Sequence, residues 1–206
     1  MAVTLRRAKA PAPPGVPVAF HAPLFQELVT GLEPTKRHVV LDLGAASTSM
    51  LALLGRSRCR VEIADFVYYG AVDELNAAET SAAVASSLLP TPLPGNEFDL
   101  VLCWDLPNYL SLDALSALMT AIKRRSRPRA LVHSLIFYAE REMSETPGHF
   151  VPAADGELVD RNTWRASVPA PRYSPEDLTN NMGGFMLDRA RLLSNGMQEF
   201  VFQYQC

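Results

Sequence analysis

Two carboxylates in this sequence follow short apolar runs, at positions where an α/β sheet binds ligands. Asp42 lies in the run Val39–Leu43, and Gly44 follows this run directly. Asp65 ends a second run, which starts at Arg60. Ligands of such sheets bind outside the carboxyl ends of the strands. A carboxylate there can accept both hydroxyls of a ribose, and the backbone N–H groups of a small-residue loop can approach a polar tail. The spacing therefore predicts a nucleotide-type cofactor site.

The loop after Asp42 departs from the glycine-rich form of such sites. A glycine-rich loop would carry glycine at three alternate positions, and Ala46 and Thr48 stand at the second and third of them. If the backbone there requires a positive φ, each replacement costs on the order of 1 kcal/mol, and each Cβ can enter the cofactor space. Whether the chain is an enzyme or the descendant of one depends on this loop.

Composition restricts the class of protein. The 206 residues favour a single domain with a substantial core. A net charge of −3 gives no general attraction to nucleic acid or anionic membranes, and no apolar run approaches the roughly 20 residues of a membrane span. The three cysteines are scattered, so we expect reduced thiols, a buried Cys103 and a cytoplasmic location. No acid between residues 140 and 160 has metal-ligand spacing with a histidine, so we expect no metal.

Hydrophobic periodicity and turn signals predict alternating strands and helices. Strands are expected at 39–43, 60–65, 98–104 and 130–138, and helices at 24–32, 50–54, 72–89 and 111–125. Ser174 and Pro175, followed by two acids, predict the start of a further helix, which ends at Gly183 and Gly184.

The C-terminal region carries the clearest topological signal. Asn195–Gly196 separates two strand-like runs, 186–194 and 198–205. Asn-Gly between two such runs is typical of a β-hairpin. The sequence therefore predicts an α/β sheet that ends in an antiparallel hairpin.

Two proline-rich segments lie outside this pattern. Residues 1–23 carry three basic residues and five prolines, and we expect an extended or disordered tail, or an arm that wraps a partner or this protein's own surface. Residues 139–173 are too long for a simple connection, so we expect a lid or an interaction surface. Trp164, with Arg161 and Arg165 beside it, could line an acceptor pocket or anchor a protein partner.

The order of these elements resembles the class I S-adenosylmethionine-dependent methyltransferases. The resemblance covers residues 24–204 and is carried by Val39–Gly44, Asp65, Leu93–Leu102, Asp105–Leu110, and Gly184–Phe185 with the hairpin. It implies a Rossmann-like sheet of seven strands, mostly parallel, with the last strand inserted antiparallel, in a domain at 24–206. It also implies a methyltransferase that uses S-adenosylmethionine and acts on a small molecule or a protein side chain.

The resemblance implies a cofactor that lies over the carboxyl ends of the strands. The implied cofactor-binding residues are Asp42, Gly44, Ala45, Ala46, Asp65, Phe66 and Trp104. Asp42 would lie near the ammonium group, Asp65 would bind the ribose hydroxyls, and Phe66 would pack on the adenine. Trp104 would face the methyl group. The family often has an acid near the adenine amino group, where this chain offers only serines at 86 and 87.

Three residues are candidates for the chemistry. Asp105 ends the fourth strand, and Tyr109 follows it in a segment that loosely echoes the Asn/Asp-Pro-Pro-Tyr motif of amino-group methyltransferases, with different spacing. His149 lies in the long 139–173 segment, on the expected substrate side. Methyl transfer needs mainly in-line positioning, and it needs a base only where the acceptor arrives protonated.

Each assignment has an alternative. Asp42 could cap its turn, Asp65 could be a surface carboxylate, and we expect His133 to be a satisfied core histidine. The basic residues between 123 and 129 could be a solvated helix end, or could contact phosphate or an acidic partner. For the whole chain, one alternative is a degenerate methyltransferase fold that serves as a binding or structural subunit. Another is an NAD-type dehydrogenase, since Asp65 lies 21 residues after Gly44.

Overall fold

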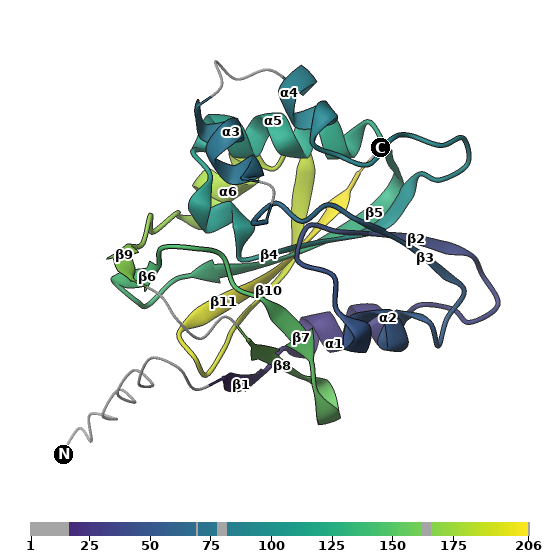
Figure 1. Cartoon of the computed structure of the whole chain (residues 1–206), viewed down its shortest axis with the longest axis horizontal. Coiled ribbons are helices and arrows are strands. Elements are labelled where there is room, and N and C mark those ends of the chain that lie inside the picture. The colour runs from purple at the N-terminus through teal and green to yellow at the C-terminus, as the bar shows by residue number, and fades with distance from the viewer. Residues whose placement is uncertain (1–16, 69, 78–81, 162–165, 206) are drawn as a thin grey trace.

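Six strands form the central sheet of the protein (Figure 1). This computed structural model describes residues 17–68, 70–77, 82–161 and 166–205, and its strand order is β10-β11-β5-β4-β2-β3. Four strands are parallel: β2 (His38–Asp42), β3 (Cys59–Ile63), β4 (Phe98–Trp104) and β5 (Ser126–Phe137). The last strand, β11 (Met197–Tyr204), lies between β5 and β10 (Phe185–Leu192) and is antiparallel to both.

Helices cover both faces of this sheet (Figure 1). α3 (Ala71–Ala77), α4 (Ala82–Ser87), α5 (Leu112–Lys123) and α6 (Pro175–Asn181) lie on one face, and α1 (Pro23–Thr30) and α2 (Thr48–Leu54) lie on the other. Ser47, Ser111 and Ser174 cap α2, α5 and α6, because each side chain accepts a backbone N–H of the first turn. With both faces covered, β2 is buried along its whole length, which explains its continuous apolar sequence.

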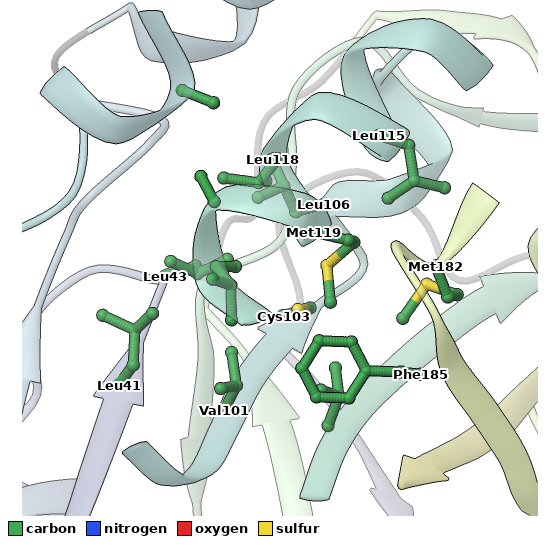
Figure 2. Close-up of a cluster of buried hydrophobic side chains, with 14 of the residues drawn as sticks. Leu41, Leu43, Val101, Cys103, Leu106, Leu115, Leu118, Met119, Met182 and Phe185 are labelled. Atoms are coloured by element: carbon green, nitrogen blue, oxygen red, sulfur yellow. The ribbon is translucent and has the colours of Figure 1, made fainter. Parts of the chain in front are cut away.

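The core on the α3–α6 face is built from apolar side chains. Figure 2 shows Val101 and Cys103 of β4 beneath Leu118 and Met119 of α5, with Phe185 of β10 beside them. All five residues are at most 1% exposed. Each buried side chain of this size contributes about 2 kcal/mol of apolar transfer free energy, so this face holds the sheet and its helices together.

A second, smaller sheet covers the α1–α2 face. β1 (Val18–His21) pairs with β8 (Glu157–Asp160), and β8 also pairs with β7 (Phe150–Pro152). The short 3-10 helix η2 (Ala154–Gly156) connects β7 to β8. We call residues 18–30 and 146–160 the cap, because the β1–β8 ladder joins the N-terminal arm to this part of the 139–173 segment. A separate ribbon pairs β6 (Glu142–Ser144) with β9 (Ser167–Pro169).

The predicted hairpin is confirmed. β10 and β11 pair from Phe185 with Tyr204 to Leu192 with Gln198. The N–H of Leu193 donates to the carbonyl of Met197, so three residues form the turn, and Gly196 has a φ of 86°. A three-residue hairpin loop needs glycine at this left-handed position, which explains the Asn-Gly signal.

The sheet has one strand fewer than expected among the described residues. The resemblance implied seven strands, but the described residues between β3 and β4 form the helices α3 and α4. The sequence Ala82–Ser87 is rich in alanine, and Val84 is its single residue of a type that favours strands. β3 is therefore an edge strand of this sheet.

Both proline-rich segments contain regular structure. The 139–173 segment contributes strands β6 to β9, although its sequence showed no period. Residues 1–16 lie outside the described residues, whereas Val18–His21 pairs with the protein's own β8, and Pro23 begins α1. For this stretch the structure matches the arm that wraps the protein's own surface. In the part of the chain described here, no helix has the length and apolarity to cross a membrane.

Candidate functional site

Asp42 ends β2 with its carboxylate buried. Its Oδ1 accepts the backbone N–H of Gly44 at 2.9 Å and the indole N–H of Trp104 at 2.6 Å, and the residue is 3% exposed. Burial raises the pKa of Asp42 above its ordinary value, although the hydrogen bonds from Trp104 and Gly44 act in the opposite direction. Asp42 therefore caps its own turn and also anchors the tryptophan at the end of β4.

The loop after β2 carries none of the strain expected from its missing glycines. No residue between 44 and 48 has a positive φ, so the condition for a penalty at Ala46 and Thr48 is not met. Ser47 faces the helix, and its hydroxyl accepts the N–H of Met50 at 3.0 Å. The tight position is Gly44, where a Cβ would lie 2.8 Å from two atoms of the Trp104 indole. Lack of space beside Trp104, rather than backbone conformation, requires glycine here.

Trp104 fills the space between this loop and the cap. Its indole stacks on Phe150 of β7, with ring centroids 5.8 Å apart, and packs against Phe25 of α1 at 5.6 Å and His133 of β5 at 6.0 Å. The residue is 4% exposed and has a φ of 53°. A left-handed backbone costs a bulky residue about 1–2 kcal/mol, so the surrounding contacts must hold Trp104 in place.

Asp65 and Phe66 follow β3, beside the end of β2. Oδ1 of Asp65 accepts the N–H groups of Val67 at 3.2 Å and Tyr68 at 2.9 Å, and the residue is half-buried. Phe66 is 1% exposed and packs in the core on the α3–α6 face. Among the described residues, Tyr68 is an aromatic side chain near Asp65 with an exposed ring, at 80% exposure.

The two serines expected near an adenine lie on α4. The Ser86 hydroxyl donates to the carbonyl of Ala82, and the Ser87 hydroxyl donates to that of Val84. Both hydroxyl protons are therefore used within their own helix, a common arrangement for helical serine. Neither side chain replaces the acid that the family often has at this position.

Asp105 and Tyr109 bind the backbone of the cap. Both oxygens of Asp105 accept the N–H of Gly148, at 3.0 and 2.9 Å, and the residue is 1% exposed. Tyr109, at the end of the 3-10 helix η1 (Leu106–Tyr109), donates its hydroxyl proton to the carbonyl of Thr146 at 3.0 Å. A side chain at Gly148 would collide with the ring of Phe150. These contacts fix residues 146–150 over the end of β4.

His149 is thereby brought close to Asp42. Its backbone N–H donates to Oδ1 of Asp160 at 3.0 Å, and the proximity of its imidazole acts to lower the pKa of Asp42. Its Nε2 is buried and has no hydrogen-bond partner among the described residues. The structure thus brings all three catalytic candidates to the edge that carries Asp42 and Trp104.

Sequence reasoning missed Glu199, a fully buried carboxylate of β11. Its oxygens accept the N–H groups of Leu24 at 2.9 Å and Phe25 at 2.7 Å, at the start of α1. Its Oε1 also lies 2.9 Å from Nε2 of His133, which is buried in the core as expected, although its Nδ1 has no hydrogen-bond partner among the described residues. A charged residue inside the apolar run 197–202 was the available signal, because a buried carboxylate needs several donors.

The basic residues near the end of α5 lie away from this edge. Arg125 bonds to Glu62, and Arg127 pairs with Asp99 and Glu97. Asp99 and Glu97 flank the start of β4, so these pairs lie at the amino end of the sheet. Ion pairs within the chain therefore occupy both arginines, and neither is offered to a phosphate.

Cys103 and the residues around Trp164 are the remaining candidates from the sequence. Burial raises the pKa of Cys103 to about 12, which confirms the expected buried thiol. No group of three metal-ligating side chains occurs within the described ranges. The backbone N–H of Arg161 donates to the carbonyl of His149, whereas Trp164 and Arg165 lie outside the described residues.

Comparison with known proteins identifies the fold. No family model matches the sequence, and no curated protein sequence matches it. Among solved structures, the pyocyanin biosynthetic protein PhzM is 14% identical over 87% of this chain, with a TM-score of 0.51. DesVI of Streptomyces venezuelae is 12% identical over 86% of this chain and 89% of its own, also with a TM-score of 0.51.

A SAM-dependent methyltransferase from Aquifex aeolicus is 16% identical. The match covers 87% of this chain and 88% of that protein, with a TM-score of 0.49. This chain spans about half the length of PhzM, 54%. The likeness at these identities is one of fold, and it agrees with the strand order and the antiparallel β11. The chain has a mixed α/β fold with a central sheet, and it shares this fold with PhzM and DesVI.

Proposed function

We propose that the chain is an S-adenosylmethionine-dependent methyltransferase that acts on a small molecule or a protein side chain. The observation that carries this proposal is the placement of Asp42 and Asp65 at the carboxyl ends of β2 and β3, which are adjacent and parallel. In open α/β sheets this edge is the ligand-binding edge. Two carboxylates there offer acceptors for an ammonium group and for a pair of hydroxyls.

The residue types at this edge fit S-adenosylmethionine. Asp65 is half-buried and suits the two ribose hydroxyls, and Tyr68 presents an exposed ring near it. Asp42 suits the ammonium group, but the Trp104 indole covers its carboxylate in the arrangement described above. The fit is therefore complete only when Trp104 leaves Asp42.

The chain's own residues have limited chemistry to perform. The bound cofactor supplies an activated methyl group, so the protein must position the acceptor and remove a proton where the acceptor carries one. We assign the role of base to His149, because its Nε2 is buried and has no hydrogen-bond partner among the described residues. Asp105 and Tyr109 act as positioning residues, since both bind the backbone that carries His149.

A second function is supported by the burial of the Asp42 carboxylate beneath Trp104. In a degenerate member of this fold the Trp104 contact would be permanent, and no cofactor would bind. The cap and the 139–173 segment would then hold a protein partner, together with residues 1–16. This alternative explains the buried state of Asp42 and Trp104 without any movement.

Calorimetric titration with S-adenosylmethionine and S-adenosylhomocysteine separates the two functions. We expect binding in the micromolar range for the full chain and at least a tenfold loss of affinity in Asp65→Ala, since a ribose would lose both hydrogen bonds. Glu97→Ala is the matched control, because it removes an exposed carboxylate from the opposite end of the sheet. A folded chain that binds neither compound at millimolar concentration contradicts the enzyme and favours the degenerate subunit.

A further inference from the structure

Trp104 binds Asp42, a strand-end carboxylate that is suited to a cationic ligand. Its indole N–H donates to Oδ1 of Asp42 at 2.6 Å, and the two residues are 4% and 3% exposed. We propose that Trp104 is the affinity-setting residue of this edge, because its indole N–H competes with an incoming ammonium group for the Asp42 carboxylate. The inference rests on the proposed function, since it concerns access to the same site.

The position of Gly44 shows how closely the indole covers the loop. An added Cβ would lie 2.8 Å from Cδ1 and Nε1 of Trp104 and 3.2 Å from Oδ1 of Asp42. The ring therefore rests directly on the loop backbone. A ligand that reaches both this backbone and Asp42 must displace the indole.

The cap holds Trp104 in this position from two sides. Phe25 comes from α1, Phe150 comes from β7, and both pack on the indole. The β1–β8 ladder joins the two parts of the cap, and Asp105 and Tyr109 bind its 146–148 backbone. Movement of the indole thus requires the cap to loosen, whereas Asp65 and Tyr68 lie outside these contacts.

The strained backbone of Trp104 favours movement of its indole away from Asp42. Its φ of 53° belongs to a left-handed conformation that bulky residues rarely adopt. The Asp42 hydrogen bond and the aromatic contacts hold this conformation, and ligand binding to Asp42 removes the first of them. The apparent affinity of the site is then lowered by the fraction of molecules in which the indole covers Asp42.

Two substitutions of Trp104 test the competition by titration with S-adenosylhomocysteine. Trp104→Phe removes the N–H donor and keeps a ring, whereas Trp104→Ala removes both. We expect Kd to fall about threefold or more in Trp104→Phe and about tenfold or more in Trp104→Ala, relative to the full natural chain. Val201→Ala is the matched control, because it loosens the same buried cluster without a contact to Asp42. Equal tightening in Val201→Ala overturns the proposal, since general loosening would then explain the gain.

Tryptophan fluorescence gives a second readout that does not depend on the stability of Trp104 variants. The chain has two tryptophans, so Trp164→Phe leaves Trp104 as the sole emitter. We expect S-adenosylhomocysteine to shift its emission to the red and to increase its quenching by acrylamide. Binding with unchanged emission and quenching overturns the competition while leaving the proposed function intact. If the folded natural chain and both Trp104 variants fail to bind, the proposed function fails and the competition fails with it.

Discussion

The two faces of the central sheet are built on different principles. On the α3–α6 face, strands β2, β4 and β11 present Leu41, Val101 and Phe202 to apolar helices. On the face covered by the cap, the same strands bury Asp42, Trp104 and Glu199, each with a polar group that needs a partner. Apolar packing tolerates many sequences, whereas each buried carboxylate requires specific donors. The α3–α6 face therefore maintains the fold, and the capped face determines the position of the cap on the sheet.

The two carboxylates of the capped face differ in their partners. Glu199 accepts two backbone N–H groups of α1 and contacts His133, so three donors from fixed elements surround it. Asp42 accepts one side-chain donor, Trp104, and one N–H from its own loop. A side chain can turn away without unfolding a helix, whereas a helix N-terminus cannot. This difference marks Glu199 as the anchor of the cap and Asp42 as the group that can change partners.

The largest effect is expected at Glu199. Glu199→Ala leaves His133 and the first N–H groups of α1 without their acceptor in a fully buried site. Breaking a buried interaction of this kind costs about 3–5 kcal/mol of unfolding free energy. Urea unfolding monitored by circular dichroism measures this loss.

Glu199→Gln serves as the matched control for this substitution. It retains one oxygen acceptor, so we expect a smaller loss than in Glu199→Ala. A loss below about 1 kcal/mol in Glu199→Ala would place Glu199 outside the set of required buried contacts. The contrast between the two carboxylates would then disappear.

Sequence patterns located the elements of the apolar face more accurately than those of the capped face. The β4 strand was predicted with its observed bounds, and Ser174 was identified at the start of its helix, because periodicity and capping are local properties. Helix α1 of the cap was predicted, but its strands β1, β7 and β8 were not, since they are short and are stabilised by the pairing of β8 with β7 and with the distant β1. Propensity alone cannot reveal such pairing.

In the candidate site, too, local features were predicted and long-range contacts were not. Asp42 and Asp65 were located from the runs that precede them, because a strand end is visible in sequence. The hydrogen bond from Trp104 to Asp42 joins residues 62 positions apart and depends on a left-handed backbone at Trp104. The conditional strain at Ala46 and Thr48 does not arise, because neither residue adopts the positive φ of a glycine-rich loop. Contacts of this range and local geometry of this kind follow from packing, which the sequence does not display.

An intermediate effect is expected on the apolar face, at the start of α6. Ser174 accepts the N–H of Asp177, and Asp177 accepts the N–H of Ser174, which forms a capping box. Ser174→Ala should lower the unfolding free energy by about 1 kcal/mol, because the first turn loses an acceptor. Thermal unfolding measures this change. Ser174→Asp is the control, since aspartate is also a good N-cap, and altered S-adenosylhomocysteine binding in Ser174→Ala would contradict the separation of the two faces.

The smallest effect should occur at Asp42, with the opposite sign. Burial raises the pKa of this carboxyl above 3.8 in the folded chain, so its contribution to stability is complete below that pH and is lost as pH rises through the folded pKa. Asp42→Asn keeps an acceptor for the Trp104 N–H and removes the titration. We expect a Tm about 2 °C above that of the natural chain at neutral pH, with the difference vanishing toward about pH 4. Tm measured across this range should show the gain together with weaker binding of S-adenosylhomocysteine. A gain that stays constant with pH would attribute the effect to packing, and a loss of Tm at neutral pH would show that Asp42 stabilises the fold as Glu199 does.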